Sequence, residues 1–593
     1  MADTPSPPTG SLDEKTVTMV DPNEKTGTYD DAAVDTAADA HTEGHAQKTL
    51  VQIPRSEKWI LWISVLLMCY ANGLDNFTMG VYLQTAASQF RGITQYTTIA
   101  VIQSMLLGVL KPFWARFADL FGRAAGFALS ILLFTVGVII VAASQSIEDL
   151  SAGIVFFAIG STGVSLCIDL VLADLVTARW RPTVSALLTV HFIINFGVSS
   201  KITGALVPNN WRWGVGMFTI INPVVTLPVV IVLARQQWRA YKAGLLAPYP
   251  YRGMSVGGAF LTFAREIDAL GLFFISAGFL FVLLPLTIAS AAPHGFQTGY
   301  IIAMFVLGGV FLVLFPFVEL YVSPMPMVNI RKISRNVNVL IPAGIVFIDQ
   351  FSYGLTLTPV YQWSQIMFGW NVTNATYFMY TQSLCLVVFN IVAGFICTMT
   401  GRYKWVTFSG AVIRFVGLGL MIRYRTAGSS TAQAVVPQVI QGLGGGFMTA
   451  STLVVAQAAV SHDEVAIVTG FFLLVLEVGS SIGSAVVGAV QKQLHGELMT
   501  DLAGLANTTV IETIYLEGAT AAVQYPLGSA IRTGIVKAWS SNMHSLLIGA
   551  IIIASFDVIL AFFLPDKVLP DSQNFSDDEA AETPVPIAMR QNE

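Results

Sequence analysis

The stretch KPFWARFADLFGR, Lys111 to Arg123, lies between two long apolar runs, 96–115 and 125–143. An apolar run of about 18 or more residues predicts a helix that spans a membrane. The charged residues of the stretch therefore occupy a very short loop between two spans, and Gly122 permits a tight turn there. We interpret the loop as a hinge; an ordinary basic cytoplasmic loop is the alternative. Its candidate hinge residues are Arg116, Asp119, Gly122 and Arg123.

A second stretch, GFICTMTGR at 394–402, repeats the spacing of this loop between two further apolar runs. Thr398 stands where the first copy has Asp119, and Gly401 and Arg402 repeat the final glycine and arginine. A weak internal repeat of this kind is typical of transporters built from two related helical bundles. The sequence therefore predicts two bundles, each with a hinge after its second span.

The composition places almost the whole chain in a membrane. Of its 593 residues, 54% are hydrophobic and only 11% are charged, which excludes a water-soluble protein of this size. The first 50 residues are polar and are predicted to be disordered. All four cysteines fall inside apolar runs, so we expect packing residues rather than disulfides or metal ligands. They are Cys69, Cys167, Cys385 and Cys397.

Hydropathy predicts an all-α membrane protein with fourteen transmembrane helices. The expected spans are 59–82, 96–115, 125–143, 151–174, 182–207, 213–234, 269–290, 299–321, 338–362, 375–399, 405–424, 433–460, 464–490 and 543–564. Two six-helix bundles would separate the hinges by six spans, but eight lie between them, so the seventh and eighth form an inserted pair. The expected domains are a cytoplasmic tail 1–55, a bundle 56–235, a cytoplasmic loop 236–268, the inserted pair 269–321, a bundle 322–564 with an outer loop 491–542, and an acidic tail 565–593.

The distribution of Lys and Arg predicts that both termini are cytoplasmic. The loops 144–149 and 291–298 carry neither residue and are expected outside. Asp174 lies near Arg179 at the inner end of the fourth span, where the two are expected to form a cytoplasmic charge latch. The same topology makes Asn507 the best candidate for glycosylation.

Polar residues inside two spans form stripes at helical spacing. Asn72, Asp75, Asn76 and Tyr82 share one face of the first span, and Asp349, Tyr353 and Thr356 share one face of the ninth. Ionisable groups are costly inside a membrane, so such stripes are expected to face a central cavity. Asp75 and Asp349 are the candidates for proton coupling; a structural ion pair with Lys111, Lys201 or Arg414 is the alternative. Asp169 and Glu477 are weaker candidates.

The hinge stretch resembles the loop signature of the major facilitator superfamily, with Ala115 and Leu120 as departures. Over about 55–565 the chain also resembles the fungal siderophore–iron transporters, a branch of that superfamily with fourteen spans. The similar pieces are GLD (73–75), KPFWARFADLFGR (111–123), ADLVTARWR (173–181), FIIN (192–195), WRWGVGMFTIINP (211–223), FIDQFSY (347–353), QGLGGGF (441–447) and YPLGSAIRTGIVKAW (525–539).

This resemblance implies proton-driven import of ferric siderophore chelates of the hydroxamate type. The expected location is the plasma membrane, with an endosomal or vacuolar membrane as the alternative. Iron would enter only inside its chelate, so no enzyme activity, resident metal, cofactor or nucleic acid is expected. The expected cavity walls are aromatic and hydroxyl side chains: Asn72, Asn76, Tyr82, Tyr353, Thr356, Tyr361, Trp363, Tyr377 and Tyr380. The polar N-terminal tail is a candidate for ubiquitination at Lys15, Lys25 and Lys48.

Two other functions fit the same fold. One is a drug–proton antiporter with fourteen spans, although the fifth span lacks the internal proline that such exporters usually carry. The other is a nutrient receptor that signals without transport. The outer loop 491–542 is expected to fold partly as short helices that form a lid over the outer mouth of the second bundle. Arg532 is expected to contact an anionic chelate or the lid's own carboxylates, and Tyr525 to stack on the chelate or to pack within the loop. A packed surface loop without a gating role is the alternative.

Overall fold

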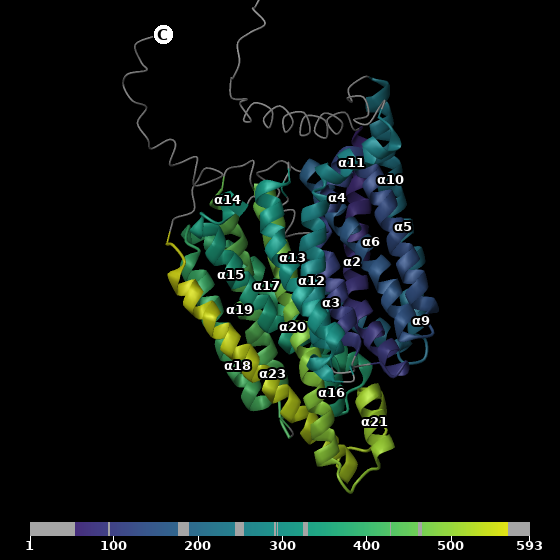
Figure 1. Ribbon diagram of the computed structural model, residues 1–593, viewed down its shortest axis with the longest axis vertical. Coiled ribbons are helices and arrows are strands. Elements are labelled where there is room, and N and C mark those ends of the chain that lie inside the picture. Colours follow the sequence, from purple (N-terminus) through teal and green to yellow (C-terminus); the bar gives the residue numbers. More distant parts are fainter. Residues whose placement is uncertain are drawn as a thin grey trace, which may run out of the picture.

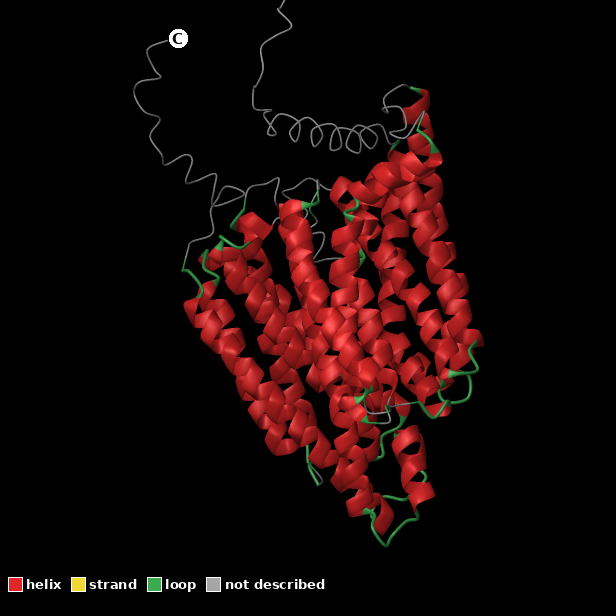
Figure 2. Ribbon diagram, viewed as in Figure 1, coloured by secondary structure: helices red, strands yellow, loops and turns green. Residues whose placement is uncertain are grey.

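The computed structural model describes residues 54–92, 95–175, 189–243, 254–289, 292, 294–323, 326, 330–426, 428–460 and 465–566. The described residues form helices and no strands, as Figure 2 shows. Both tails, with the three candidate ubiquitination lysines, lie outside the described residues.

The N-terminal half contains the first six predicted spans. Its helices are α2 (Arg55–Gln89), α3 (Tyr96–Val109), α4 (Lys111–Phe121), α5 (Arg123–Ala143), α6 (Ile147–Leu175), α8 (His191–Leu206), α9 (Trp211–Gly216) and α10 (Phe218–Lys242). A short helix α11 (Val256–Glu266) precedes the inserted pair, α12 (Ala269–Ile288) and α13 (Gly299–Tyr321), which the 3₁₀ turn η2 (Gly295–Gln297) links.

The C-terminal half contains the last six predicted spans. Its helices are α14 (Ile330–Ile333), α15 (Val337–Leu357), α16 (Val360–Phe368), α17 (Val372–Thr400), α18 (Lys404–Tyr424), α19 (Thr431–Ala458), α20 (Val465–Asp501), α21 (Thr508–Glu517), α22 (Ala519–Ala522) and α23 (Ala530–Phe563).

Twelve helical segments among the described residues are long and apolar enough to cross a membrane, which shows a multi-pass membrane protein. The other two predicted spans correspond to shorter helices. Span 96–115 falls on α3 and the start of α4, and span 182–207 includes α8, with part of its range outside the described residues. The total of fourteen spans therefore stays a prediction.

The two halves meet along two seams. Helix α3 packs against α20 along one seam, and α8 packs against α17 along the other. The inserted helix α12 contacts α13, α3 and α20, so the inserted pair lies against the first seam (Figure 1). Figure 1 also places α21 at the end of the molecule opposite α11 and α14. We call this end the α21 end.

The outer loop is much shorter than the expected range 491–542. Helix α20 continues to Asp501 and α23 already begins at Ala530, so only 502–529 separates them. The apolar run stops near residue 490, but good helix formers such as Gln, Leu, Glu and Met continue the helix beyond it. The expected short helices are present as α21 and α22.

Candidate functional site

Asp75 occupies the middle of α2 and is completely buried. Neither of its carboxylate oxygens has a hydrogen-bond partner among the described residues. Tyr82, about two helical turns further along α2, and Tyr380 of α17 lie close enough to interact electrostatically with Asp75. A buried carboxylate without a partner is costly unless it carries a proton, because an ionised group needs solvent or a counter-ion.

Tyr380 connects the polar stripes of the two halves. Its hydroxyl donates to the backbone carbonyl of Asn76 at 3.4 Å, and its ring lies 4.4 Å from that of Phe77. It also interacts electrostatically with three tyrosines from three other helices, and these are Tyr96, Tyr353 and Tyr361. Phenol groups from α3, α15 and α16 therefore gather around Tyr380, which itself lies beside Asp75. Tyr96 was not among the residues predicted from the sequence, where its only signal is its position at the start of the second span.

Asp349 forms a buried ion pair in the C-terminal half. Its Oδ1 lies 2.8 Å from Nε of Arg414 on α18, and the two side chains are 6% and 5% exposed. The alternative pairing with Arg414 is thus what the structure shows. Asp557 of α23, also buried, interacts electrostatically with both partners. The sequence analysis missed Asp557, although it is a single acidic residue inside the last apolar run.

Tyr353 lies one helical turn beyond Asp349 on α15. Its hydroxyl is 3.1 Å from the Ser383 hydroxyl of α17, and its backbone carbonyl accepts a hydrogen bond from Thr356 at 3.0 Å. It interacts electrostatically with Asp349 and Arg414 as well as with Tyr380. Tyr353 therefore joins the tyrosine group to the buried ion pair.

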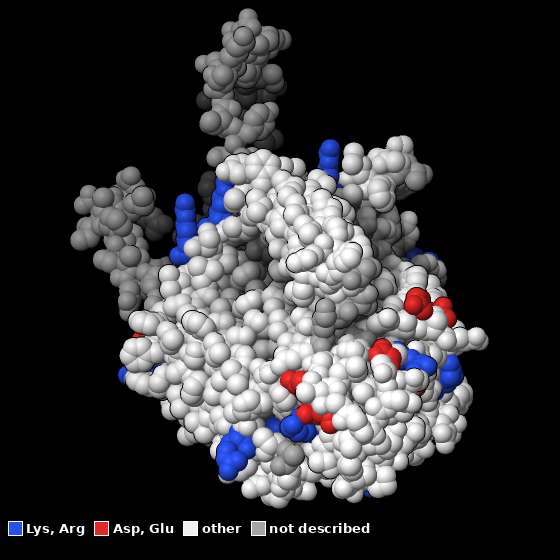
Figure 3. Space-filling view, turned by 60° about the horizontal axis from the view of Figure 1, so that its bottom comes forward, with Lys and Arg blue, Asp and Glu red and all other residues white. Residues whose placement is uncertain are grey.

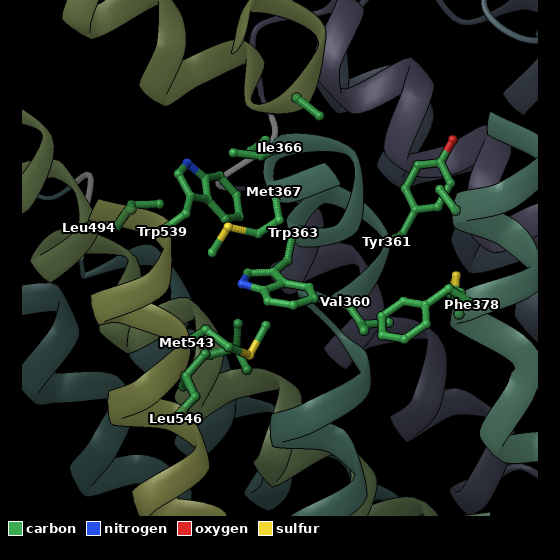
Figure 4. Packing of buried hydrophobic residues seen from close by; sticks show 14 of the residues in the cluster. Val360, Tyr361, Trp363, Ile366, Met367, Phe378, Leu494, Trp539, Met543 and Leu546 are labelled. Carbon is green, nitrogen blue, oxygen red and sulfur yellow. The ribbon is translucent and has the colours of Figure 1, made fainter. Parts of the chain in front are cut away.

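The side chains of Tyr361 and Trp363 on α16 point in different directions, as Figure 4 shows. Tyr361 hydrogen-bonds to Thr85 of α2, across the interface between the halves. Trp363 is fully buried in the largest apolar cluster, where Met543 and Trp539 from α23 surround it. The predicted cavity position of Trp363 is therefore wrong: Trp363 is a core residue, because α16 turns it towards α23.

The remaining expected cavity residues lie near the same centre. Asn76 is exposed although it lies in the middle of α2, and its amide donates to the Asn72 carbonyl at 2.9 Å. Tyr377 packs against Phe196 of α8, with ring centroids 5.1 Å apart. Tyr82 is buried beside Gly214, where an added Cβ would lie 2.5 Å from its ring.

A second charged group lies at the seam of α3 and α20. Lys111, at the start of α4, interacts electrostatically with Asp169 of α6 and with Glu477 of α20. Lys111 is therefore placed between carboxylates of the two halves. Lys111 is thus the interaction partner of Asp169 and Glu477, the two weaker proton-coupling candidates, rather than of Asp75 or Asp349.

At the α21 end, a group of contacts holds α21 and α22 against α2. Ser88 donates to the Glu517 carbonyl and to the Thr520 hydroxyl, the latter at 2.7 Å. Arg91 bonds Thr513 at 3.1 Å and pairs with Glu517 at 3.4 Å. We call these five residues the α21 clasp. The expected lid over the C-terminal bundle thus also fastens to the N-terminal half, and Figure 3 shows this end with only small mixed groups of charges.

Arg532 is buried and donates to the backbone carbonyls of Gln365 at 3.0 Å, Ile366 at 2.8 Å and Ala522. Arg532 therefore joins the end of α22 to α16, and its side-chain hydrogen bonds among the described residues go to backbone carbonyls rather than to the expected lid carboxylates. Tyr525 is partly buried against the large apolar cluster. Asn507 is exposed and caps α21, accepting from the Val510 amide at 2.9 Å.

Both hinges contain a glycine with positive φ, as their sequences predict. Gly122 ends α4 with φ 91°, and Gly401 ends α17 with φ 64°. Arg402 pairs with Asp566 at 3.5 Å. Arg123 begins α5. The side chains of the remaining hinge and charge-latch candidates lie outside the described residues; these are Arg116, Asp119, Asp174 and Arg179.

Searches for relatives place these features in a family. The chain is 31% identical to the MFS siderochrome iron transporter B of Aspergillus fumigatus over 505 residues, which cover 82% of this chain and 80% of that protein. It is 30% identical to the siderophore transporter fer7 of Mycosarcoma maydis, covering 87% and 81%. The low affinity heme transporter str3 of Schizosaccharomyces pombe is 29% identical, covering 86% and 82%. No family model matches the chain.

Solved structures agree on the fold. A POT family transporter in complex with 5-aminolevulinic acid matches with a TM-score of 0.53 at 14% identity, covering 88% of this chain and 99% of that one. A bacterial Spinster homologue matches with a TM-score of 0.52 at 15% identity, covering 86% and 98%. The fold is therefore that of a major facilitator transporter. Within that class, the chain belongs to the fungal siderophore–iron transporter family, whose members are transporters and not enzymes.

Proposed function

We propose that this protein imports ferric siderophore chelates of the hydroxamate type together with protons. The observation that carries the proposal is Asp75, a completely buried carboxylate with no hydrogen-bond partner among the described residues, which lies beside Tyr82 and Tyr380. The names of the relatives support the substrate class, since several are siderophore transporters.

The tyrosine group suits an oxygen-rich chelate. The hydroxyls of Tyr353, Tyr361 and Tyr380 and the amide of Asn76 can donate hydrogen bonds to chelate oxygens, while the rings pack against its carbon backbone. The chelate supplies all the iron ligands, so the protein needs no metal site of its own. Iron is then substrate and not cofactor.

Transport would proceed by alternating access between the two halves. The basic loops favour cytoplasmic termini, and the same topology puts the loop between the last two spans outside. That loop contains α21, so we take the α21 end as the outer side. The described contacts between α8 and α17 and the α21 clasp then close the outer side. Gly122 and Gly401 mark the inner hinges. We place the protein in the plasma membrane, where a chelate from the medium can reach it.

The test is uptake of radiolabelled iron in cells that lack their own siderophore importers. Ferric hydroxamates, ferric catecholates and haem are offered separately, because one relative is a heme transporter. We expect accumulation of a hydroxamate that a protonophore abolishes, and at least a tenfold loss in Asp75→Asn. Uptake that ignores the protonophore would contradict proton coupling. Drug efflux would favour the antiporter, and a nutrient response without uptake would favour the receptor.

A further inference from the structure

Asp557, the second buried carboxylate of the C-terminal half, belongs to a charged group whose members come from three helices. Helix α15 contributes Asp349, α18 contributes Arg414, and α23 contributes Asp557. Helices α15 and α18 both pack against α23. The arginine lies against glycines of α19: a Cβ on Gly445 would lie 2.5 Å from its Nη1, and one on Gly444 would lie 2.7 Å from its Cγ. The glycine-rich stretch therefore makes room for Arg414.

The charges of this group do not balance without a proton. A guanidinium stays protonated under all physiological conditions, so Arg414 supplies one positive charge. Two ionised carboxylates would leave one net negative charge inside the membrane, at a cost of several kcal/mol. Charge balance is reached when one carboxyl group carries a proton.

Among the described residues, the other cations of α18 make contacts of their own at its two ends. Lys404 lies over the Phe562 ring at 5.7 Å, and Arg423 lies over the Tyr424 ring at 5.9 Å. Helix α19 contains no Asp, Glu, Lys, Arg or His, and α15 contains only Asp349 and the neutral Tyr353 nearby. Glu477 of α20 interacts with Lys111 at the seam instead. The nearest ionisable residue along α23 is His544, thirteen residues from Asp557, or about 20 Å along a helix.

The geometry distinguishes the two carboxyl groups. Asp349 makes the direct 2.8 Å contact with Arg414. Asp349 and Asp557 each have an Oδ1 without a hydrogen bond among the described residues, but of these two carboxyl groups only Asp349 lies within ion-pair distance of Arg414. We propose that Asp557 is the group that binds the transported proton, with Asp349 holding Arg414 in place. The proposal rests on the proposed proton-coupled function and names the residue that performs it in this half.

Tyr353 links this proton site to the substrate centre. It interacts electrostatically with Asp349 and Arg414 on one side and with Tyr380 on the other. A chelate that binds the tyrosine group displaces the Tyr353 hydroxyl from Ser383 and changes the field at the ion pair. A proton taken from the outer solution onto an Asp557 oxygen is then released to the inner solution, and no other reactant is consumed.

The experiment compares accumulation with exchange. The variant Asp557→Asn resembles the protonated state, so we expect at least a tenfold loss of protonophore-sensitive accumulation. Exchange of labelled for unlabelled chelate across the membrane should stay within about twofold of the unaltered protein, since the substrate centre is intact. The matched control is Glu319→Gln, which neutralises a buried carboxylate of the inserted pair. It is expected to accumulate chelate as the unaltered protein does.

Asp557→Glu provides a second measurement that keeps the carboxyl group. It should restore accumulation and move its pH profile to higher pH, because a glutamate binds its proton slightly more tightly than an aspartate. If Asp557→Asn does not reach the membrane, this profile decides, and an unchanged profile overturns the inference. Proton-driven accumulation that persists in Asp557→Asn also overturns it and leaves the proposed function intact. Protonophore-insensitive uptake by the unaltered protein refutes the proposed function itself.

Discussion

Removing the α21 clasp should open the outer side of the transporter more often. The change is Ser88→Ala together with Arg91→Ala, which removes the hydrogen bonds to Glu517, Thr513 and Thr520 and one ion pair. Both residues lie at the end of α2, so the tyrosine group and the buried ion pair stay unaltered.

The free energy that the clasp contributes to the closed state can be judged from how exposed its side chains are. The side chains of Arg91 and Glu517 are 54% and 23% exposed, so solvent screens their ion pair and its contribution is well under 1 kcal/mol. The partly buried hydrogen bonds of Ser88 contribute about 0.5–1.5 kcal/mol. A total of about 1–2 kcal/mol corresponds to a factor of about 5–30 in the equilibrium between closed and open states.

The assay measures access to the centre from outside. Asn76→Cys, in a background without the four native cysteines, places a thiol at an exposed position beside Tyr380. A membrane-impermeant maleimide should label it about 5–30 times faster when the clasp is removed. The matched control is Lys537→Ala, which breaks an ion pair with Asp501 at the same end but within the C-terminal half. Equal labelling rates in the clasp variant and this control would refute the reasoning.

Three further outcomes are expected. Asp119→Asn should slow transport at least severalfold while chelate binding from outside is retained, measured as turnover against binding; lost binding with normal turnover would contradict a hinge role. Replacing Lys15, Lys25 and Lys48 by arginine should lengthen residence at the cell surface when iron supply changes, measured by surface biotinylation; unchanged turnover would exclude ubiquitination there. Trp363→Ala should lower stability by about 3–5 kcal/mol through the cavity it leaves; a thermal unfolding midpoint equal to that of the unaltered protein would contradict its core position.

Sequence patterns alone determined most of the architecture. Long apolar runs predicted the membrane helices, because a bilayer tolerates few exposed backbone polar groups. The repeated hinge spacing predicted the paired turns, and Gly122 and Gly401 do adopt positive φ. The stripe on the first span marked Asp75 as an interior residue, and the structure buries it completely.

Tertiary structure alone decided which of these polar residues meet. Asp349 and Arg414 are far apart in sequence, and only the packing of both α15 and α18 against α23 adds Asp557 to their pair. Likewise, hydropathy did not distinguish Trp363 from Tyr361, because both are aromatic residues on one short helix whose orientation its neighbours set. Periodicity describes the face of one helix, whereas a binding site or an ion pair depends on the register between helices, which no single segment encodes.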